Sequence, residues 1–103
     1  MKSKEGVVER KLKTEIEKLG GLCYKFVSPG RRNVPDRLCI LPGSIIFFVE
    51  VKAPGQQPTN GQFREGTRIN DLGIRVFWVC TTGEVLDLIE HIKMFGTQVS
   101  PKM

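Results

Sequence analysis

The architecture of this protein follows from residues 35–52, which read Pro-Asp-Arg-Leu-Cys-Ile-Leu-Pro-Gly-Ser-Ile-Ile-Phe-Phe-Val-Glu-Val-Lys. Two runs that favour strands, 37–41 and 45–52, are separated by Pro42-Gly43-Ser44, which indicates a turn. The second run is apolar on both faces until its last three residues, which is typical of a central strand covered on both sides. These residues therefore predict two strands joined by a turn, the second at the centre of a sheet.

Charged side chains stand at both ends of this unit. Asp36 follows Pro35, which stiffens the chain, so its carboxylate is presented at the entry of the first strand. Glu50 and Lys52 point to one face at the end of the second strand, about 6.7 Å apart at two rises of roughly 3.3 Å. Ligands collect where strands end in sheets covered by helices. The alternative for Glu50 and Lys52 is a strand that becomes polar as it reaches the surface.

Asp36 and Glu50 together would form a pocket of oxygen ligands. Two carboxylates and a strand carbonyl suit Mg²⁺, which keeps several waters and is commonly completed by a substrate phosphate. Lys52 could then orient or deprotonate a water and stabilise charge on the phosphate in the transition state. These residue types favour a metal-dependent reaction at a phosphate group.

Helical and strand-forming patterns flank this unit on both sides. The first helical pattern ends at Gly20-Gly21, and the last carries four apolar residues, Val85, Leu88, Ile89 and Ile92, on one face. The expected elements are a helix from Val8 to Leu19, strands at 22–27, 37–41, 45–52 and 74–80, a helix from the N-cap Thr59 to 72–73, and a helix after the N-cap Thr81. The order is therefore α-β-β-β-α-β-α in one domain.

The composition predicts one small, basic, folded domain. The chain has 103 residues, a formal net charge of +5 and 40% hydrophobic residues, which is unlike the composition of disordered chains. The longest apolar run, 45–49, is far too short to cross a membrane. We therefore expect a soluble protein with no membrane partner.

Three cysteines, Cys23, Cys39 and Cys80, lie far apart in apolar surroundings. They form no disulfide framework or zinc motif that can be recognised. Each is expected to be a small buried residue in a strand, with a reactive thiol as the alternative. Free thiols favour a reducing compartment, so we expect a cytoplasmic protein.

Basic side chains surround Asp36. Arg31, Arg32 and Arg37 flank it in the sequence, and Lys25 precedes them on the first strand. A solvated surface is the usual place for such charges, but here they lie where a substrate phosphate would approach. The sequence contains no motif that reads bases, so nucleic-acid binding through these residues should follow the backbone and its shape.

The motif Pro35-Asp36 followed by Glu50-Val51-Lys52 resembles the PD-(D/E)XK nuclease signature. With Glu9, residues 30–37, residues 48–52 and Gln62, the chain is similar to the VRR-NUC branch, the virus-type replication-repair nuclease domain, over about residues 5–95. The resemblance implies an α/β fold with a restriction-endonuclease-like αβββαβα core, in which helices flank a mixed central sheet. Residues 1–103 would then form one nuclease domain with a flexible tail at 96–103.

The resemblance also implies roles for individual residues. Asp36 and Glu50 would hold the divalent metal, Val51 would contribute its carbonyl, and Lys52 would assist the attacking water. Glu9 would reach the metal site as a further ligand or through water.

Glu9 and Gln62 each have an alternative role. Glu9 lies only roughly 20° around its helix from Ile16, on the core side, but it could instead pair with Lys13 one turn away. Gln62 stands at the capping-box spacing from Thr59. It could contact a phosphate or the lysine as well only if its amide abandons the cap.

These observations predict a DNA endonuclease that uses Mg²⁺ or Mn²⁺ and no organic cofactor. We expect it to hydrolyse phosphodiester bonds in branched or four-way-junction DNA during replication, recombination or repair. Symmetrical cleavage of a junction needs two active sites in fixed relation, so a homodimer is expected. The alternative is a module with a nuclease-like fold that binds nucleic acid without cutting it, against which the intact set of Asp36, Glu50 and Lys52 argues.

Overall fold

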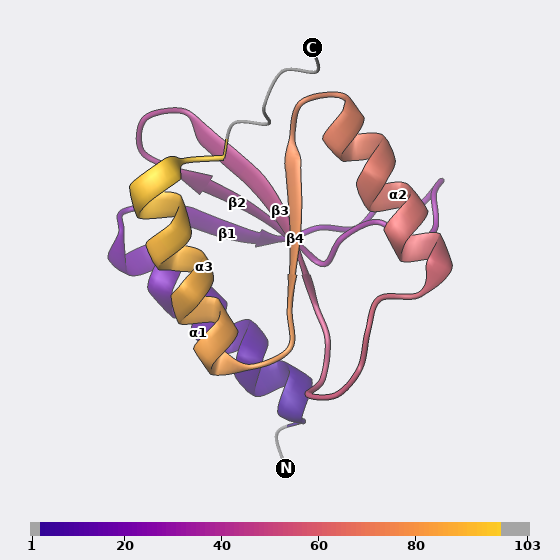
Figure 1. Ribbon diagram of the computed structural model, residues 1–103, viewed down its shortest axis with the longest axis horizontal. Helices are drawn as coiled ribbons and strands as arrows, with labels where there is room; N and C mark the ends of the chain where they lie inside the picture. The colour runs from indigo at the N-terminus through magenta and orange to yellow at the C-terminus, as the bar shows by residue number, and fades with distance from the viewer. Residues whose placement is uncertain (1–2, 98–103) are drawn as a thin grey trace.

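A computed structural model describes residues 3–97 of the protein. A mixed sheet forms its centre (Figure 1). The elements in chain order are α1 (Lys4–Lys18), β1 (Leu22–Lys25), β2 (Arg37–Leu41), β3 (Ile45–Val51), α2 (Asn60–Asp71), β4 (Arg75–Val79) and α3 (Thr82–Phe95). The strand order is β1-β2-β3-β4, with antiparallel pairing except between β3 and β4, which are parallel. The predicted αβββαβα order and mixed sheet are confirmed.

The hairpin of β2 and β3 fixes the position of both acidic motif residues. Leu41 pairs with Ile45 across the turn, where Gly43 and Ser44 both have positive φ, the conformation for which glycine is best suited. At the other end of the hairpin Arg37 pairs with Val49. Continued by one residue, this register sets Asp36 opposite Glu50.

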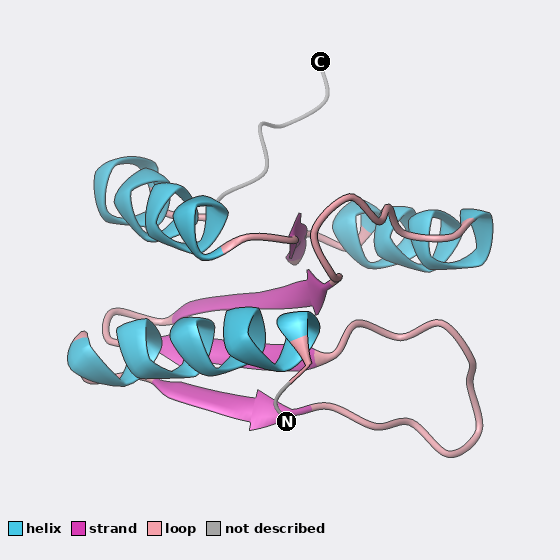
Figure 2. Ribbon diagram, turned by 90° about the horizontal axis from the view of Figure 1, so that it is seen from below, coloured by secondary structure: helices cyan, strands magenta, loops and turns pink. Residues whose placement is uncertain are grey.

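The apolar core lies between the sheet and the helices α1 and α3, which pack together over one face (Figure 2). Its centre on β3 consists of Phe47, Val49 and Val51, which alternate along the strand and are fully buried. The four apolar residues predicted on one face of α3, Val85, Leu88, Ile89 and Ile92, are all buried in this core. The predicted faces of the hairpin strand and of α3 are therefore observed.

The opposite face of the sheet is only partly covered. Helix α2 packs on β4 (Figure 1), while Leu22, Tyr24 and Ile46 are 48%, 52% and 40% exposed. The prediction that β3 is covered on both sides is therefore wrong for the start of that strand. With their cross-strand neighbours these residues form an apolar sheet face, which comprises Leu22, Tyr24, Leu38, Ile40, Ile46 and Phe48.

The cysteines differ from expectation in two respects. Cys23 and Cys39 are buried, as predicted, but they are not far apart, because antiparallel pairing brings their Sγ atoms to 3.8 Å. Cys80 follows the end of β4 and is only partly buried. Its thiol donates a hydrogen bond to Glu84 Oε1 at 3.0 Å, so this cysteine does not behave as a core residue.

Some boundaries also differ from the sequence prediction. Helix α1 begins at Lys4, one turn before Val8, because the Ser3 hydroxyl accepts a hydrogen bond from the Gly6 N–H at 2.9 Å. Strand β1 ends at Lys25 instead of residue 27. The predicted flexible tail lies, from residue 98 onward, outside the described residues. No helix within residues 3–97 combines the length and apolar character needed to cross a bilayer.

Candidate active site

Asp36 and Glu50 meet where β2 begins and β3 ends. The Asp36 Oδ2 atom accepts a hydrogen bond from the Val51 N–H at 2.8 Å, which ties this carboxylate to the backbone beside Glu50. The Asp36 carbonyl accepts a second bond, from the Phe26 N–H at 2.8 Å, and Pro35 is fully buried. The stiff Pro-Asp dipeptide predicted from the sequence is therefore held on both sides.

Glu50 is a buried carboxyl beside another carboxyl. Only 5% of the residue is exposed. Burial raises the pKa of Glu50 to about 8, and the hydrogen bond from Asp36 and its negative charge act in the same direction, partly opposed by Lys52. Two carboxyl groups share a hydrogen bond only if one carries a proton. At neutral pH Glu50 therefore holds a proton between the two carboxyl groups. A cation could occupy this place in exchange for the proton.

Lys52 and Gln62 are brought together beside this pair. The Lys52 Nζ atom donates a hydrogen bond to Gln62 Oε1 at 3.4 Å. The same oxygen accepts the Thr59 N–H at 2.8 Å and completes the capping box of α2. The expectation that Gln62 must leave the cap to reach the lysine is wrong, because one carbonyl oxygen has two lone pairs.

Glu9 pairs with a residue that the sequence did not suggest. Its Oε1 accepts a hydrogen bond from Arg37 Nε at 2.7 Å, and both side chains are mostly buried. The predicted alternative partner, Lys13, is therefore wrong. The direct ligand role of Glu9 stays a prediction, and it requires the carboxylate to leave Arg37 or to use its second oxygen.

Glu5 is an acidic residue that the sequence analysis missed. It lies one turn before Glu9 on α1, and its negative charge contributes to the raised pKa of Glu50. Residues four apart share a helix face, so the signal was present in the sequence. It was overlooked because the predicted helix began at Val8.

The predicted basic residues have different surroundings. Arg37 is engaged by Glu9 and by the Cys23 carbonyl, which accepts a bond from its Nη1 at 3.3 Å. Arg32 and Lys25 are exposed. Arg31 donates from Nε to both oxygens of the buried Glu65, at 2.8 and 2.9 Å. The charge of Arg32 and Lys25 is thus open to a partner, whereas that of Arg37 is largely used within the fold.

Two further arginines, Arg64 and Arg68, join this basic region from α2. They line a depression of about 450 Å³ together with Gly30, Arg31, Arg32, Asn33, Gly61 and Glu65. Arg68 also approaches Glu65, at 3.8 Å. Arg64 and Arg68 were not predicted from the sequence, because only the position of α2 beside the loop at 30–33 makes them neighbours of Arg31 and Arg32.

The ligands available for a metal are oxygen atoms. Within residues 3–97, no three His, Cys, Asp or Glu side chains are grouped as a metal site. Asp36 and Glu50 supply two carboxylates, and the Val51 peptide lies beside them. Such a small, hard ligand set suits an ion that keeps several waters, as Mg²⁺ does, and not one that needs a full protein cage.

Comparisons with known proteins point to nucleases. No family model matches the chain. It is 55% identical over 73 residues to "Putative nuclease p44" of Acyrthosiphon pisum secondary endosymbiont phage 1, an alignment that covers 71% of this chain and 78% of that protein. It also resembles a solved structure described as "VRR_NUC domain", with a TM-score of 0.83 and 43% sequence identity, over 86% of this chain and 97% of the other.

Proposed function

Because the chain belongs to the VRR-NUC nuclease family, we propose that it is a metal-dependent endonuclease that hydrolyses phosphodiester bonds in DNA. The observation that carries this proposal is the Asp36 and Glu50 pair beside Lys52, at the end of the central strand. A buried carboxyl with a raised pKa at such a position is typical of a functional site.

The donor set supports Mg²⁺ or Mn²⁺ as the ion. Asp36, Glu50 and the Val51 carbonyl would hold it. When bound, such an ion polarises the phosphate and lowers the pKa of a water in its coordination shell. Its positive charge would also offset the burial of Glu50 and the negative charge of Asp36, which together raise the pKa of Glu50.

Lys52 would assist the attacking water, and its surroundings support this role. The Gln62 carbonyl holds its ammonium group, and the capping box with Thr59 holds Gln62 in turn. A fixed ammonium group can orient the water and offset the negative charge that develops on the phosphate oxygens. Gln62 would therefore be a positioning residue for Lys52.

The basic depression beside α2 would guide the DNA backbone. Four arginines, Arg31, Arg32, Arg64 and Arg68, surround a single glutamate there. Guanidinium groups bind phosphate oxygens in pairs without reading bases. We therefore expect binding that depends on salt and on DNA shape more than on sequence.

The apolar sheet face supports the homodimer. Leu22, Tyr24 and Ile46 expose neighbouring apolar side chains on this face. A two-fold axis would cover the same face on both copies. Two copies would carry two active sites, as paired incisions in a branched DNA require. We propose branched or four-way-junction DNA as the substrate on this basis.

One experiment tests the function and its rival. Labelled linear, flapped and four-way-junction DNAs are incubated with the protein in Mg²⁺, in Mn²⁺ and in EDTA. A nuclease should cut at least one of these DNAs in Mg²⁺ or Mn²⁺ but none of them in EDTA. The four-way junction should show paired nicks. Tight binding without cleavage in any metal would favour the alternative, a binding module with a nuclease-like fold.

A further inference from the structure

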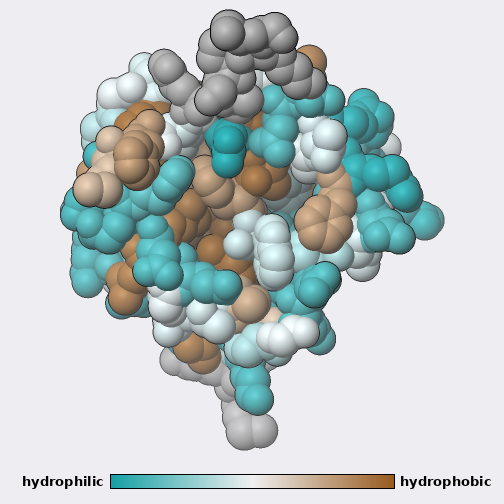
Figure 3. Space-filling model, in the orientation of Figure 1, coloured by the Kyte–Doolittle hydropathy of each residue, from teal (hydrophilic) through white to brown (hydrophobic). Residues whose placement is uncertain are grey.

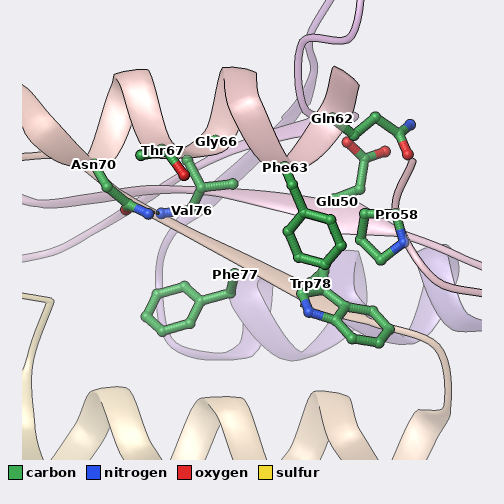
Figure 4. A pocket seen from close by; sticks show the side chains of 10 residues that line it. All are labelled: Glu50, Pro58, Gln62, Phe63, Gly66, Thr67, Asn70, Val76, Phe77 and Trp78. Carbon is green, nitrogen blue, oxygen red and sulfur yellow. Dashed lines mark hydrogen bonds between the residues drawn. The ribbon is translucent and has the colours of Figure 1, made fainter. Parts of the chain in front are cut away.

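A cavity of about 170 Å³ opens beside Glu50, between α2 and β4 (Figure 4). Glu50, Gln62 and Pro58 stand at one end of it, beside the rings of Phe63 and Trp78. On this side of the molecule the surface is hollowed over β4 and exposes apolar atoms (Figure 3). We call the cavity beside Glu50 the Phe63–Trp78 cavity.

The fold places both aromatic rings next to the catalytic carboxyl. Trp78 on β4 is the register partner of Glu50 in the parallel pair, so the two side chains leave the same face of the sheet. Phe63 follows Gln62 on α2. Phe63 is 46% exposed and Trp78 is 40% exposed, and neither belongs to the apolar core. Two large rings therefore face solvent at the edge of the site.

We propose that the Phe63–Trp78 cavity binds one nucleobase of the strand being cut, by stacking it against Trp78 and Phe63. The proposal rests on the proposed function, which puts the scissile phosphate beside Glu50. The base of the same nucleotide is then only one sugar away from the cavity. Aromatic rings stack on any base, since every base has a π face. The binding would thus tolerate any sequence.

The size of the cavity supports a single base as the occupant. Pockets for drug-sized ligands measure roughly 300–1,000 Å³, so this smaller cavity of about 170 Å³ suits one planar ring system better than a peptide or a helix face. A second copy of the chain would instead cover the apolar sheet face, which lies on β1, β2 and β3.

Such a site restricts the class of substrate. A base within a duplex is paired and stacked, and extracting it costs a few kcal/mol, least where the base is already unpaired. The chain should therefore prefer DNA that offers an unpaired nucleotide next to the scissile phosphate, as branch points, flaps and gaps do. Selection for branched DNA would then arise within the active site of each copy.

Trp78 is the only tryptophan of the chain, so its fluorescence reports on the cavity without a label. In EDTA, a short oligothymidine should quench this fluorescence, whereas an abasic deoxyribose-phosphate oligomer of equal length, with the same charge and no bases, should not. Phe63→Ala should weaken binding of oligothymidine by about 5- to 150-fold, the value of one base stack. The control Phe95→Ala, which alters an exposed ring on α3, should change nothing.

Cleavage gives an independent readout. Single-turnover rates are measured on a flapped DNA with a thymine, or an abasic site, next to the cut. The thymine should accelerate cleavage by the unmodified protein but not by Trp78→Ala, and Trp78→Phe should recover part of the preference. Equal quenching by both oligomers, or an undiminished thymine preference in Trp78→Ala, would overturn the proposal.

A change of oligomeric state in Trp78→Ala, measured by light scattering, would also overturn the proposal, because the ring would then contact a second copy. If no DNA is cut, the proposed function fails, while the fluorescence titration still decides whether bases stack on Trp78.

Discussion

Metal binding at neutral pH should release a proton from Glu50. With a pKa of about 8, its carboxyl is about nine-tenths protonated at pH 7 and about one-tenth protonated at pH 9. A divalent ion needs the ionised carboxylate. Binding of Mg²⁺ or Mn²⁺ should therefore release about 0.9 proton at pH 7 and about 0.1 at pH 9. The release arises because Glu50 is buried against Asp36.

Isothermal titration calorimetry measures this release. The metal is titrated at each pH in two buffers whose enthalpies of ionisation differ, and the difference in observed heat gives the number of protons. The measurement at pH 9 serves as the internal control, because Glu50 is then already ionised. Binding with no buffer dependence at pH 7 would mean that the ion binds away from Glu50 or that the carboxyl is ionised beforehand, and either result would exclude this coupling.

The same pKa shift determines how stability depends on pH without metal. The folded pKa of Glu50 lies above its ordinary value of 4.5, so the folded state holds a proton that the unfolded chain has lost. The free energy of unfolding should therefore fall as pH rises from about 4.5 to about 8. Thermal melts in EDTA should show this loss, and saturating Mg²⁺ should reduce it.

Three further predictions concern the basic depression, the capping box of α2 and the apolar sheet face. Arg32→Ala combined with Arg64→Ala should lower the slope of log binding constant against log salt by about 2 for all DNA sequences alike, and an unchanged slope in filter binding would show that this region does not contact phosphate. Gln62→Ala should lower the free energy of unfolding by about 1 kcal/mol and also slow cleavage. Thr59→Ala should cost a similar stability of about 1 kcal/mol but leave the cleavage rate nearly intact. Equal cleavage rates in the two variants would show that Gln62 does not position Lys52. Ile46→Lys on the apolar sheet face should reduce the mass measured by light scattering from about twice 11.6 kDa to 11.6 kDa, and a monomeric unmodified protein would contradict the dimer.

The hairpin made the centre of the site predictable from the sequence. The turn at 42–44 leaves one register in which the apolar faces of β2 and β3 coincide, and that register places Asp36 against Glu50. Burial of alternate residues on β3 then follows from strand periodicity. Lys52 lies two residues after Glu50 in the same extended segment. The geometry of the chain is therefore enough to bring Lys52 close to Glu50.

Contacts between distant elements could not be read in the same way. The pairing of Glu9 with Arg37 depends on how α1 lies across the sheet, which helical periodicity does not specify. The position of Trp78 opposite Glu50 depends on the parallel register of β3 and β4, which a whole helix separates in the chain. Arg64 and Arg68 become part of the basic region only once α2 packs near the loop at 30–33.

Asp36 and Glu50 would together hold the metal ion on which DNA cleavage depends. Cleavage of a four-way-junction DNA is measured for Asp36→Asn and Glu50→Gln across a titration of Mg²⁺, with circular dichroism to verify folding. The control is Glu15→Gln, which removes the charge of a mostly buried carboxylate on α1 that pairs with Lys18. Both site variants should stay folded and lose cleavage at every Mg²⁺ concentration, while the control cuts the junction. Full cleavage by either site variant, or cleavage by the unmodified protein in EDTA, would show that these two carboxyl groups do not hold a required metal.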